Sequence, residues 1–156
     1  MSRSPDVLLM HAASFIGVSE IAPNRGPQID KWEWRAQKIR GQPWCACYAW
    51  SMLDDIGIKL PIQFPAAVGS WVDWAKANGR LRTRPFKGMA VSYSWGGSTP
   101  RPSDHIGFVE KVLALPHLPG RSRYWIKTIE GNSADAVKRN WRWVDPSTVA
   151  FIDVLG

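Results

Sequence analysis

The stretch GQPWCACYAW, residues 41–50, is the part of the chain from which the fold can best be predicted. It reads as a loop that feeds a helix, because Pro43 suits a first helical turn and cannot extend a preceding helix. We expect this helix over residues 44–56, stopped by the glycine that follows. It begins beside Cys45 and Cys47, the only cysteines in the chain.

Three more amphipathic helices are expected in the first half of the chain. Capping residues, prolines and glycines bound them as follows: Ser4 to Gly17, about Ile29 to Lys38, and the segment framed by Phe64-Pro65 and Asn78-Gly79.

After Arg80 the hydrophobic pattern changes to period two, which indicates strands. Five short runs rich in Val, Ile, Tyr, Phe and Trp are expected to be strands: 89–95, 105–113, 124–130, 139–144 and 149–154. Helices followed by strands predict an α+β fold.

Composition favours one compact domain over residues 1–156. The chain has 45% hydrophobic residues, a net charge of +7 and a pI of about 9.8. Such a charge favours anionic partners, which include nucleic acid, an acidic membrane face and the bacterial cell wall. No apolar run approaches the ~20 residues of a membrane span. The apolar stretch at residues 7–18 is interpreted as part of the first helix and not as a signal peptide.

The two cysteines differ in their expected surroundings. Cys45 lies in the first turn of its helix, where unpaired backbone N–H groups and the helix dipole stabilise a thiolate. A helical wheel places it at the edge of the stripe expected to be buried, which is formed by Ala46, Ala49, Trp50 and Leu53. Cys47 lies on the other flank, where a free cysteine usually serves as a small buried hydrophobe. The sequence therefore favours Cys45 as a nucleophile.

His105 is the best candidate for the base that a thiolate nucleophile needs. It begins an expected strand, and Gly107 on the same face leaves room for a close approach. A hairpin that closes around His117 would pair His105 with Glu130, which would then orient the imidazole. If the register of the hairpin slipped by two residues, Asn132 would lie opposite His105 instead, because residues two apart point to the same face of a strand.

Three segments in this order resemble the CHAP family, the cysteine- and histidine-dependent amidohydrolases and peptidases that cleave bacterial cell walls. They are Gly41-Gln42-Pro43-Trp44-Cys45-Ala46, Asp104-His105-Ile106-Gly107-Phe108-Val109-Glu110 and Ile129-Glu130-Gly131-Asn132-Ser133. The resemblance implies a papain-like fold, with N-terminal helices packed on a twisted antiparallel sheet. It also implies that Cys45 is the nucleophile, His105 the base, and Glu130 with Asn132 the orienting group.

Substrate contacts are expected from residues near the proposed nucleophile. Trp44 and Trp95 could line a groove for sugar rings or peptide stems. The Cys45 backbone N–H, with Gln42 or Tyr48 as a side-chain donor, could stabilise an oxyanion. We expect no metal and no cofactor, because one residue between two cysteines is below the usual spacing of zinc ligands.

These features predict a thiol-dependent peptidoglycan hydrolase, a phage lysin or its peptidase domain. We expect a monomer without a signal peptide, held in the host cytoplasm until its release and then acting at the cell wall. The bond cut stays open between N-acetylmuramoyl-L-alanine amidase and endopeptidase activity on the stem or cross-bridge. The alternative is a basic, tryptophan-rich module without catalysis that binds nucleic acid or the wall.

Overall fold

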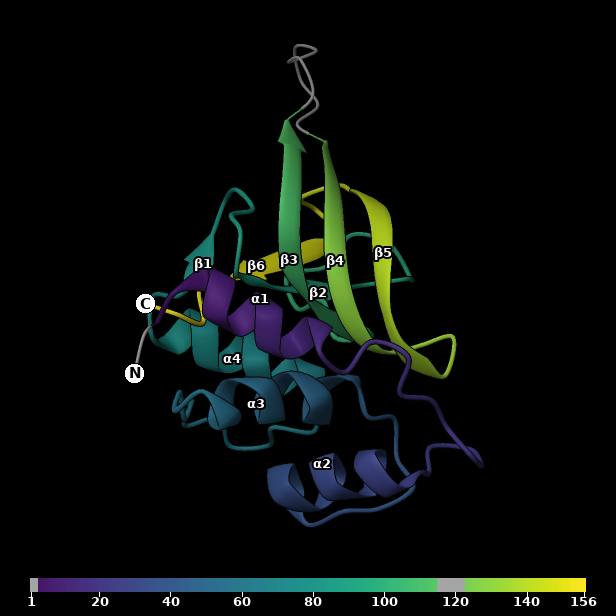
Figure 1. Ribbon diagram of the computed structural model, residues 1–156. Helices are drawn as coiled ribbons and strands as arrows, with labels where there is room; N and C mark the ends of the chain where they lie inside the picture. Colours follow the sequence, from purple (N-terminus) through teal and green to yellow (C-terminus); the bar gives the residue numbers. More distant parts are fainter. Residues whose placement is uncertain (1–2, 115–122) are drawn as a thin grey trace.

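The computed structural model describes residues 3–114 and 123–156 and has the α+β architecture predicted from the sequence. Four helices come first: α1 Pro5–Ala13, α2 Pro27–Gln37, α3 Cys45–Asp55 and α4 Val68–Ala77. Six strands follow: β1 Leu81–Arg82, β2 Ala90–Tyr93, β3 His105–Ala114, β4 Tyr124–Ser133, β5 Ala136–Val144 and β6 Val149–Ile152. They form one antiparallel sheet in the order β1-β6-β2-β3-β4-β5; α1, α3 and α4 pack against it, and α2 lies beyond α3 (Figure 1).

Two helices are shorter than the sequence suggested. The side chain of Ser4 accepts a hydrogen bond from the Asp6 backbone, which caps α1 as expected. α1 nevertheless ends at Ala13, and the chain turns before it reaches Gly17. α4 begins only at Val68, because the preceding residues form a turn closed by a hydrogen bond from Ala67 N to Phe64 O.

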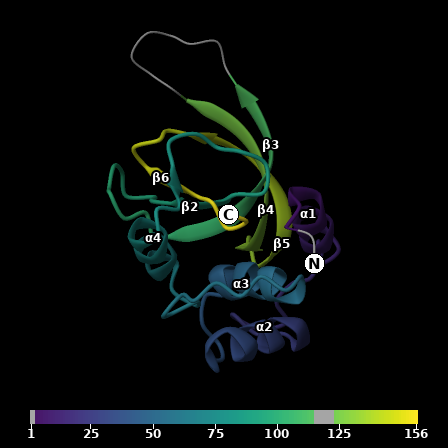
Figure 2. The ribbon, with the colours of Figure 1, turned by 90° about the vertical axis from the view of Figure 1, so that its left-hand side faces the viewer.

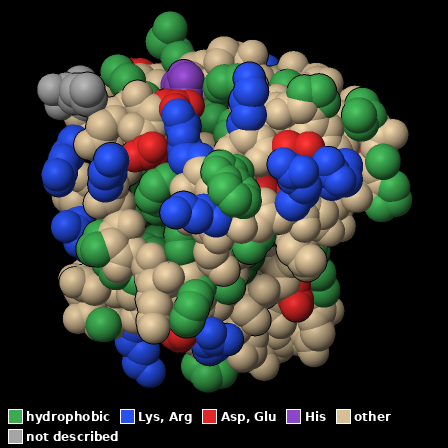
Figure 3. Space-filling view, turned by 90° about the horizontal axis from the view of Figure 1, so that it is seen from below, with side chains coloured by type: hydrophobic (Ala, Val, Ile, Leu, Met, Phe, Trp, Pro, Cys, Tyr) green, Lys and Arg blue, Asp and Glu red, His purple; other side chains and the backbone are tan. Residues whose placement is uncertain are grey.

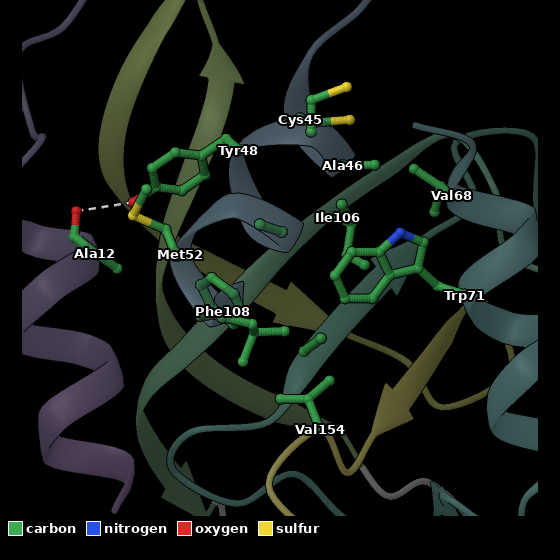
Figure 4. Packing of buried hydrophobic residues seen from close by; sticks show 14 of the residues in the cluster. Ala12, Cys45, Ala46, Tyr48, Met52, Val68, Trp71, Ile106, Phe108 and Val154 are labelled. Atoms are coloured by element: carbon green, nitrogen blue, oxygen red, sulfur yellow. Dashed lines mark hydrogen bonds between the residues drawn. The ribbon is translucent and has the colours of Figure 1, made fainter. Parts of the chain in front are cut away.

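Helix α3 lies at the centre of the molecule and is buried on nearly every side. The expected stripe was too narrow: Cys47, Tyr48 and Met52 are buried as well, whereas Trp50 is only half-buried. The reason is that α3 packs on the sheet on one side and on α2 on the other (Figures 1 and 4). A helix covered on both sides loses its polar face.

The sheet carries a different hydrophobic cluster on each face. Ile106, Phe108 and Ile129 point toward the helices and join the main core. Their sequence neighbours point the other way, where a smaller cluster includes Val109 and Ile126. The sheet is strongly curled, as Figure 2 shows.

The register between β3 and β4 differs from the expected one. Lys111 pairs with Lys127, but the next pair is Val109 with Thr128, so β3 has a bulge at Glu110. The ladder continues to Phe108 and Ile129, which puts Gly107 opposite Glu130. The predicted pairing of His105 with Glu130 is therefore wrong by two residues. The predicted turn around His117 lies outside the described residues.

No helix in the described part of the chain is both long enough and apolar enough to cross a membrane.

Candidate active site

The loop that leads into Cys45 is held by a buried glutamate on α2. The carboxylate of Glu33 accepts hydrogen bonds from the backbone N–H groups of Gly41, at 3.0 Å, and Gln42, at 2.9 Å. Gly41 adopts a positive φ of 73°, a conformation that glycine takes without strain. The sharp turn and the two hydrogen bonds fix the position at which α3 begins.

Cys45 and Cys47 are both free thiols, but they have different surroundings. Cys45 is the first residue of α3 and retains 6% of its exposure. Cys47 is fully buried, and this burial is the main cause that raises its pKa to about 12. Cys47 is therefore uncharged and inaccessible at neutral pH, as the sequence predicted for a structural cysteine.

His105, at the start of β3, touches both Cys45 and Glu130. Its Nε2 atom lies 2.8 Å from Glu130 Oε1, and the Cys45 side chain is close enough to the ring to raise its pKa. Because Nε2 is occupied by the carboxylate, Nδ1 is the ring nitrogen left for the thiol. The three residues thus form one connected series from α3 through β3 to β4.

Glu130 reaches His105 by crossing over a glycine. A Cβ atom added to Gly107 would lie 2.4 Å from Glu130 Cγ, so only glycine leaves room for this side chain. Glu130 then leans along the sheet toward His105, its diagonal neighbour. No hydrogen bond joins Asn132 to the ring among the described residues. Asn132 instead lies in the irregular end of β4, with a positive φ of 54°.

The Glu130 carboxylate is fully buried and is neutralised by its neighbours. Arg142 on β5 binds it with two hydrogen bonds of 2.6 Å, from Nε and from Nη2. Tyr93 donates at 3.2 Å and Thr128 at 2.5 Å. A buried carboxylate stays charged only when such donors replace water.

The pKa values of the pair move in opposite directions. Burial alone would raise the pKa of Glu130, but the hydrogen bonds from Arg142 and His105 lower it to about 2. Burial would likewise lower the pKa of His105, yet its hydrogen bonds to Cys45 and Glu130 raise it to about 9. At neutral pH the site therefore holds an ionised glutamate and a protonated histidine.

Aromatic rings cover the histidine. Trp95 is 61% exposed and stacks with Tyr93 and with His105, at ring-centre distances of 5.1 Å and 6.1 Å. The loop that carries Trp95 is held by Asp104, whose carboxylate accepts a hydrogen bond of 2.7 Å from the Trp95 backbone. Trp95 is thus placed beside the candidate base, where the sequence predicted a substrate contact.

Two other predicted contacts lie in the core. Trp44 is fully buried: its ring stacks on Trp32, and its Nε1 donates to Glu20 at 2.9 Å, so it does not line an open groove. The Tyr48 hydroxyl donates to the Ala12 carbonyl at 2.8 Å and points away from Cys45 (Figure 4). The side chain of Gln42 is exposed and belongs to the loop before Cys45.

Sequence reasoning missed the residues that support the site, above all Arg142, Tyr93, Thr128 and Glu33. Alternation along β4 could have placed Thr128 beside Glu130, because residues two apart share a face. The run Trp-Arg-Trp on β5 could have indicated that Arg142 faces the opposite way from its aromatic neighbours. Nothing in the sequence pairs Arg142 with a particular acid.

The match to a known family covers the three candidate catalytic residues. The family model described as CHAP domain matches residues 37–132, more than half of the chain, and this range includes Cys45, His105 and Glu130. Searches of curated proteins and of solved structures found no match. The described helices and sheet agree with the papain-like fold of that family, and the match supports a general role in hydrolysing peptidoglycan amide or peptide bonds. The chain belongs to the CHAP family.

Proposed function

We propose that this protein hydrolyses an amide bond of bacterial peptidoglycan, with Cys45 as nucleophile, His105 as general acid and base, and Glu130 as the group that orients and charges the histidine. The observation that carries this proposal is that one imidazole lies beside the Cys45 side chain and is hydrogen-bonded to the buried Glu130 carboxylate. A nucleophile, a base and an orienting group in contact are the minimum for covalent acyl transfer.

The first half of the reaction forms a thioester. The Cys45 thiolate, paired with protonated His105, attacks the amide carbonyl carbon and forms a tetrahedral oxyanion. The C–N bond then breaks as protonated His105 gives its proton to the leaving nitrogen, which departs as a free amine. A pKa of about 9 means that the imidazole carries this proton at neutral pH.

The second half returns the enzyme to its starting state. Neutral His105 takes a proton from a water molecule, whose oxygen attacks the thioester carbonyl. The C–S bond breaks and releases the carboxylic acid and the Cys45 thiolate beside the newly protonated imidazole. Glu130 remains ionised throughout, because its pKa of about 2 lies far below that of the histidine.

Oxyanion stabilisation is assigned to the start of α3. The backbone N–H of Cys45 is the first of its helix and has no partner within the helix. Gln42, an exposed amide on the loop fixed by Glu33 and three residues before Cys45, is proposed as the second donor.

The substrate class agrees with the charge of the protein. A net charge of +7 attracts the protein to anionic wall polymers at low salt. In Figure 3, Lys and Arg side chains are scattered among hydrophobic ones over the face seen, without a continuous basic stripe. Such a distribution suits a general attraction to the wall. We place the protein among phage lysins or their peptidase domains, acting at the wall as a monomer.

Mass spectrometry of fragments released from purified peptidoglycan tests this proposal. Each new amino terminus identifies the amide that was cut, and separates an N-acetylmuramoyl-L-alanine amidase from an endopeptidase. Cys45→Ala is the control and should release nothing. If wild-type protein also released no fragments, or if Cys45→Ala released them equally, the proposed reaction would be wrong.

A further inference from the structure

The sheet face that packs on the helices continues beyond them as a more open surface. Ile129 lies on this face and belongs to the main core. Lys127 and Trp125 precede it on β4 by two and four residues, so their side chains point to the same face. The outer halves of β3 and β4 extend past α1 in both ribbon views (Figures 1 and 2). The surface at this level is therefore accessible to solvent.

Strand pairing brings six side chains together on this surface. Trp125 is paired with Leu113 on β3 and with Trp143 on β5, and Lys127 is paired in the same way with Lys111 and Trp141. Residues that are directly opposite each other in a sheet point to the same face. We call the six the outer patch: Lys111, Leu113, Trp125, Lys127, Trp141 and Trp143.

The outer patch exposes apolar side chains that lie side by side. Leu113, Trp141 and Trp143 are 42%, 43% and 56% exposed, respectively. The Trp125 ring lies 5.4 Å from that of Trp141 and 5.0 Å from that of Trp143. Single exposed apolar residues are common on protein surfaces, but a contiguous group of them marks a site of interaction.

The two lysines of the patch carry charge that the protein does not neutralise. Lys111 lies directly opposite Lys127, and like charges in this arrangement repel each other. Among the described residues, neither lysine forms an ion pair, and the neighbouring Glu110 is bound by Arg139 at 2.9 Å. Lys127 instead lies over the Trp141 ring, at 5.6 Å. An anionic partner would relieve this repulsion.

We propose that the outer patch binds the surface of an anionic phospholipid bilayer. Such a bilayer offers phosphate groups for the lysines and, directly below them, hydrocarbon for the apolar side chains. Tryptophan is enriched at the boundary between these two regions, and the apolar stem of lysine lets its ammonium group stay among the headgroups. Because no helix in the described part of the chain is fit to cross a membrane, the proposed contact is peripheral.

Other anionic partners fit the outer patch less well. A single-stranded nucleic acid stacks its bases on free aromatic faces, but the Trp141 ring already stacks on Trp125, with 11° between the ring planes, and carries Lys127 above it. A soluble polyanion would use the lysines alone and leave Leu113 and Trp143 in water. A bilayer accounts for both the charge and the exposed apolar side chains.

The outer patch lies apart from the candidate active site. His105 begins β3, and Leu113 comes eight residues later, about 25 Å further along the strand. Glu130 also points to the opposite face of β4 from Trp125. A bilayer bound at the patch therefore leaves the catalytic residues open to substrate, and the proposed binding does not depend on the proposed reaction.

The test is co-sedimentation of the full chain with vesicles made of equal parts of phosphatidylglycerol and phosphatidylcholine. Wild-type protein should bind these vesicles and bind pure phosphatidylcholine vesicles much more weakly. Trp143→Ala should lower the partition coefficient by about tenfold, and Lys111→Gln by about fivefold. Trp34→Ala and Lys31→Gln are the matched controls and should bind like wild type. Trp34 is also 56% exposed but lies on α2, and Lys31 is an exposed lysine of the same helix.

Two further measurements complete the test. Phospholipids brominated in their acyl chains should quench part of the tryptophan emission, because the rings reach the hydrocarbon. A melting curve verifies the folding of each variant, and Leu113→Gln, which should lower the partition coefficient by about fivefold, replaces Trp143→Ala if that variant does not fold.

Four results would overturn the proposal. They are equal binding to both kinds of vesicle, an absence of quenching, equal losses in the patch and α2 variants, or binding of an octathymidylate through Trp143 and Lys111 by a protein that does not bind vesicles. The vesicles contain no peptidoglycan, so the result is separate from that of the hydrolysis assay. Trp143→Ala should release peptidoglycan fragments at the wild-type rate.

Discussion

The two faces of the sheet use the same strands for different purposes. On the helix side, Ile106 and Ile129 are fully buried in the main apolar core. On the other side, their immediate neighbours His105 and Glu130 form the charged centre, beside the smaller cluster. Adjacent residues of one strand therefore point to opposite faces, one into the main core and the next into the candidate active site. Changes to strand residues that face the helices should mainly lower stability, and changes to strand residues on the other face should mainly lower turnover.

The largest effect is expected at Cys45. Cys45→Ala should abolish wall lysis, measured as loss of turbidity of a cell-wall suspension, with the melting temperature nearly unchanged. Cys47→Ala should keep most of the activity and lose about 1 kcal/mol of unfolding free energy, because it removes one buried atom from the core. Iodoacetamide should label Cys45 well before Cys47, whose pKa of about 12 keeps it a thiol. Lysis by Cys45→Ala together with inactivity of Cys47→Ala would exchange the two roles.

Glu130→Gln should reduce turnover by about 10²-fold, by analogy with the third member of hydrolase triads. The amide keeps the shape but removes the charge that stabilises protonated His105. It also leaves Arg142 without its ion-pair partner, so stability should fall too, and rates must be compared at a temperature where both proteins are folded. Glu110→Gln, on the surface of β3, is the matched control. Equal rates for the two variants would rule out a role for the buried carboxylate.

Substituting alanine at either of two glycines adds one methyl group to one face of the sheet, so the two faces can be compared directly. Gly107→Ala directs a methyl group into Glu130, at 2.4 Å from Cγ, and should lower turnover by about tenfold through a displaced carboxylate. Gly131→Ala directs it into the Tyr48 side chain, 2.7–2.8 Å away on the helix side. It should lower the free energy of unfolding by about 1–3 kcal/mol, a typical effect of overpacking. Denaturant melts and kcat measured on both variants check this, and identical profiles would contradict the division between faces.

A smaller effect is expected from pH. The pKa of His105 is raised from 6.5 to about 9 in the folded protein, so the stability it contributes is complete below pH 6.5 and is lost as the pH rises to about 9. The lowered pKa of Glu130 acts at the other end: its contribution is present above pH 4.5 and disappears as the pH falls to about 2. The alkaline loss of melting temperature should be smaller in Glu130→Gln. The kcat/KM profile should fall near pH 9, where the leaving group loses its proton donor.

Much of this architecture could be predicted from local patterns. The helices and the five longer strands follow hydrophobic periodicity and the positions of proline and glycine. Cys45, His105 and Glu130 stand in segments that resemble the family later matched. Their contact could be anticipated because alternation keeps residues of one parity on one face.

The rest depends on contacts between distant parts of the chain. The bulge at Glu110 is one such feature: without it, the outer register of β3 and β4 would put His105 and Glu130 on opposite faces of the sheet. Trp44 looked like a groove residue because it precedes Cys45, but stacking on Trp32 buries it. Arg142 meets Glu130 only because β5 pairs with β4 and the sheet curls. Spacing along the sequence does not reveal these contacts.

The ion pair between Arg142 and Glu130 joins two residues that the ribosome adds at different times. A growing chain contains Cys45, His105 and Glu130 before Arg142 has been added, and chains fold from the N-terminus as they emerge. Until β5 joins the sheet, the glutamate lacks the guanidinium that keeps it charged in the interior. An incomplete chain thus carries every reactive group but not their working charge states. The buried site can therefore reach its final charge state only after β5 has been synthesised and has joined the sheet.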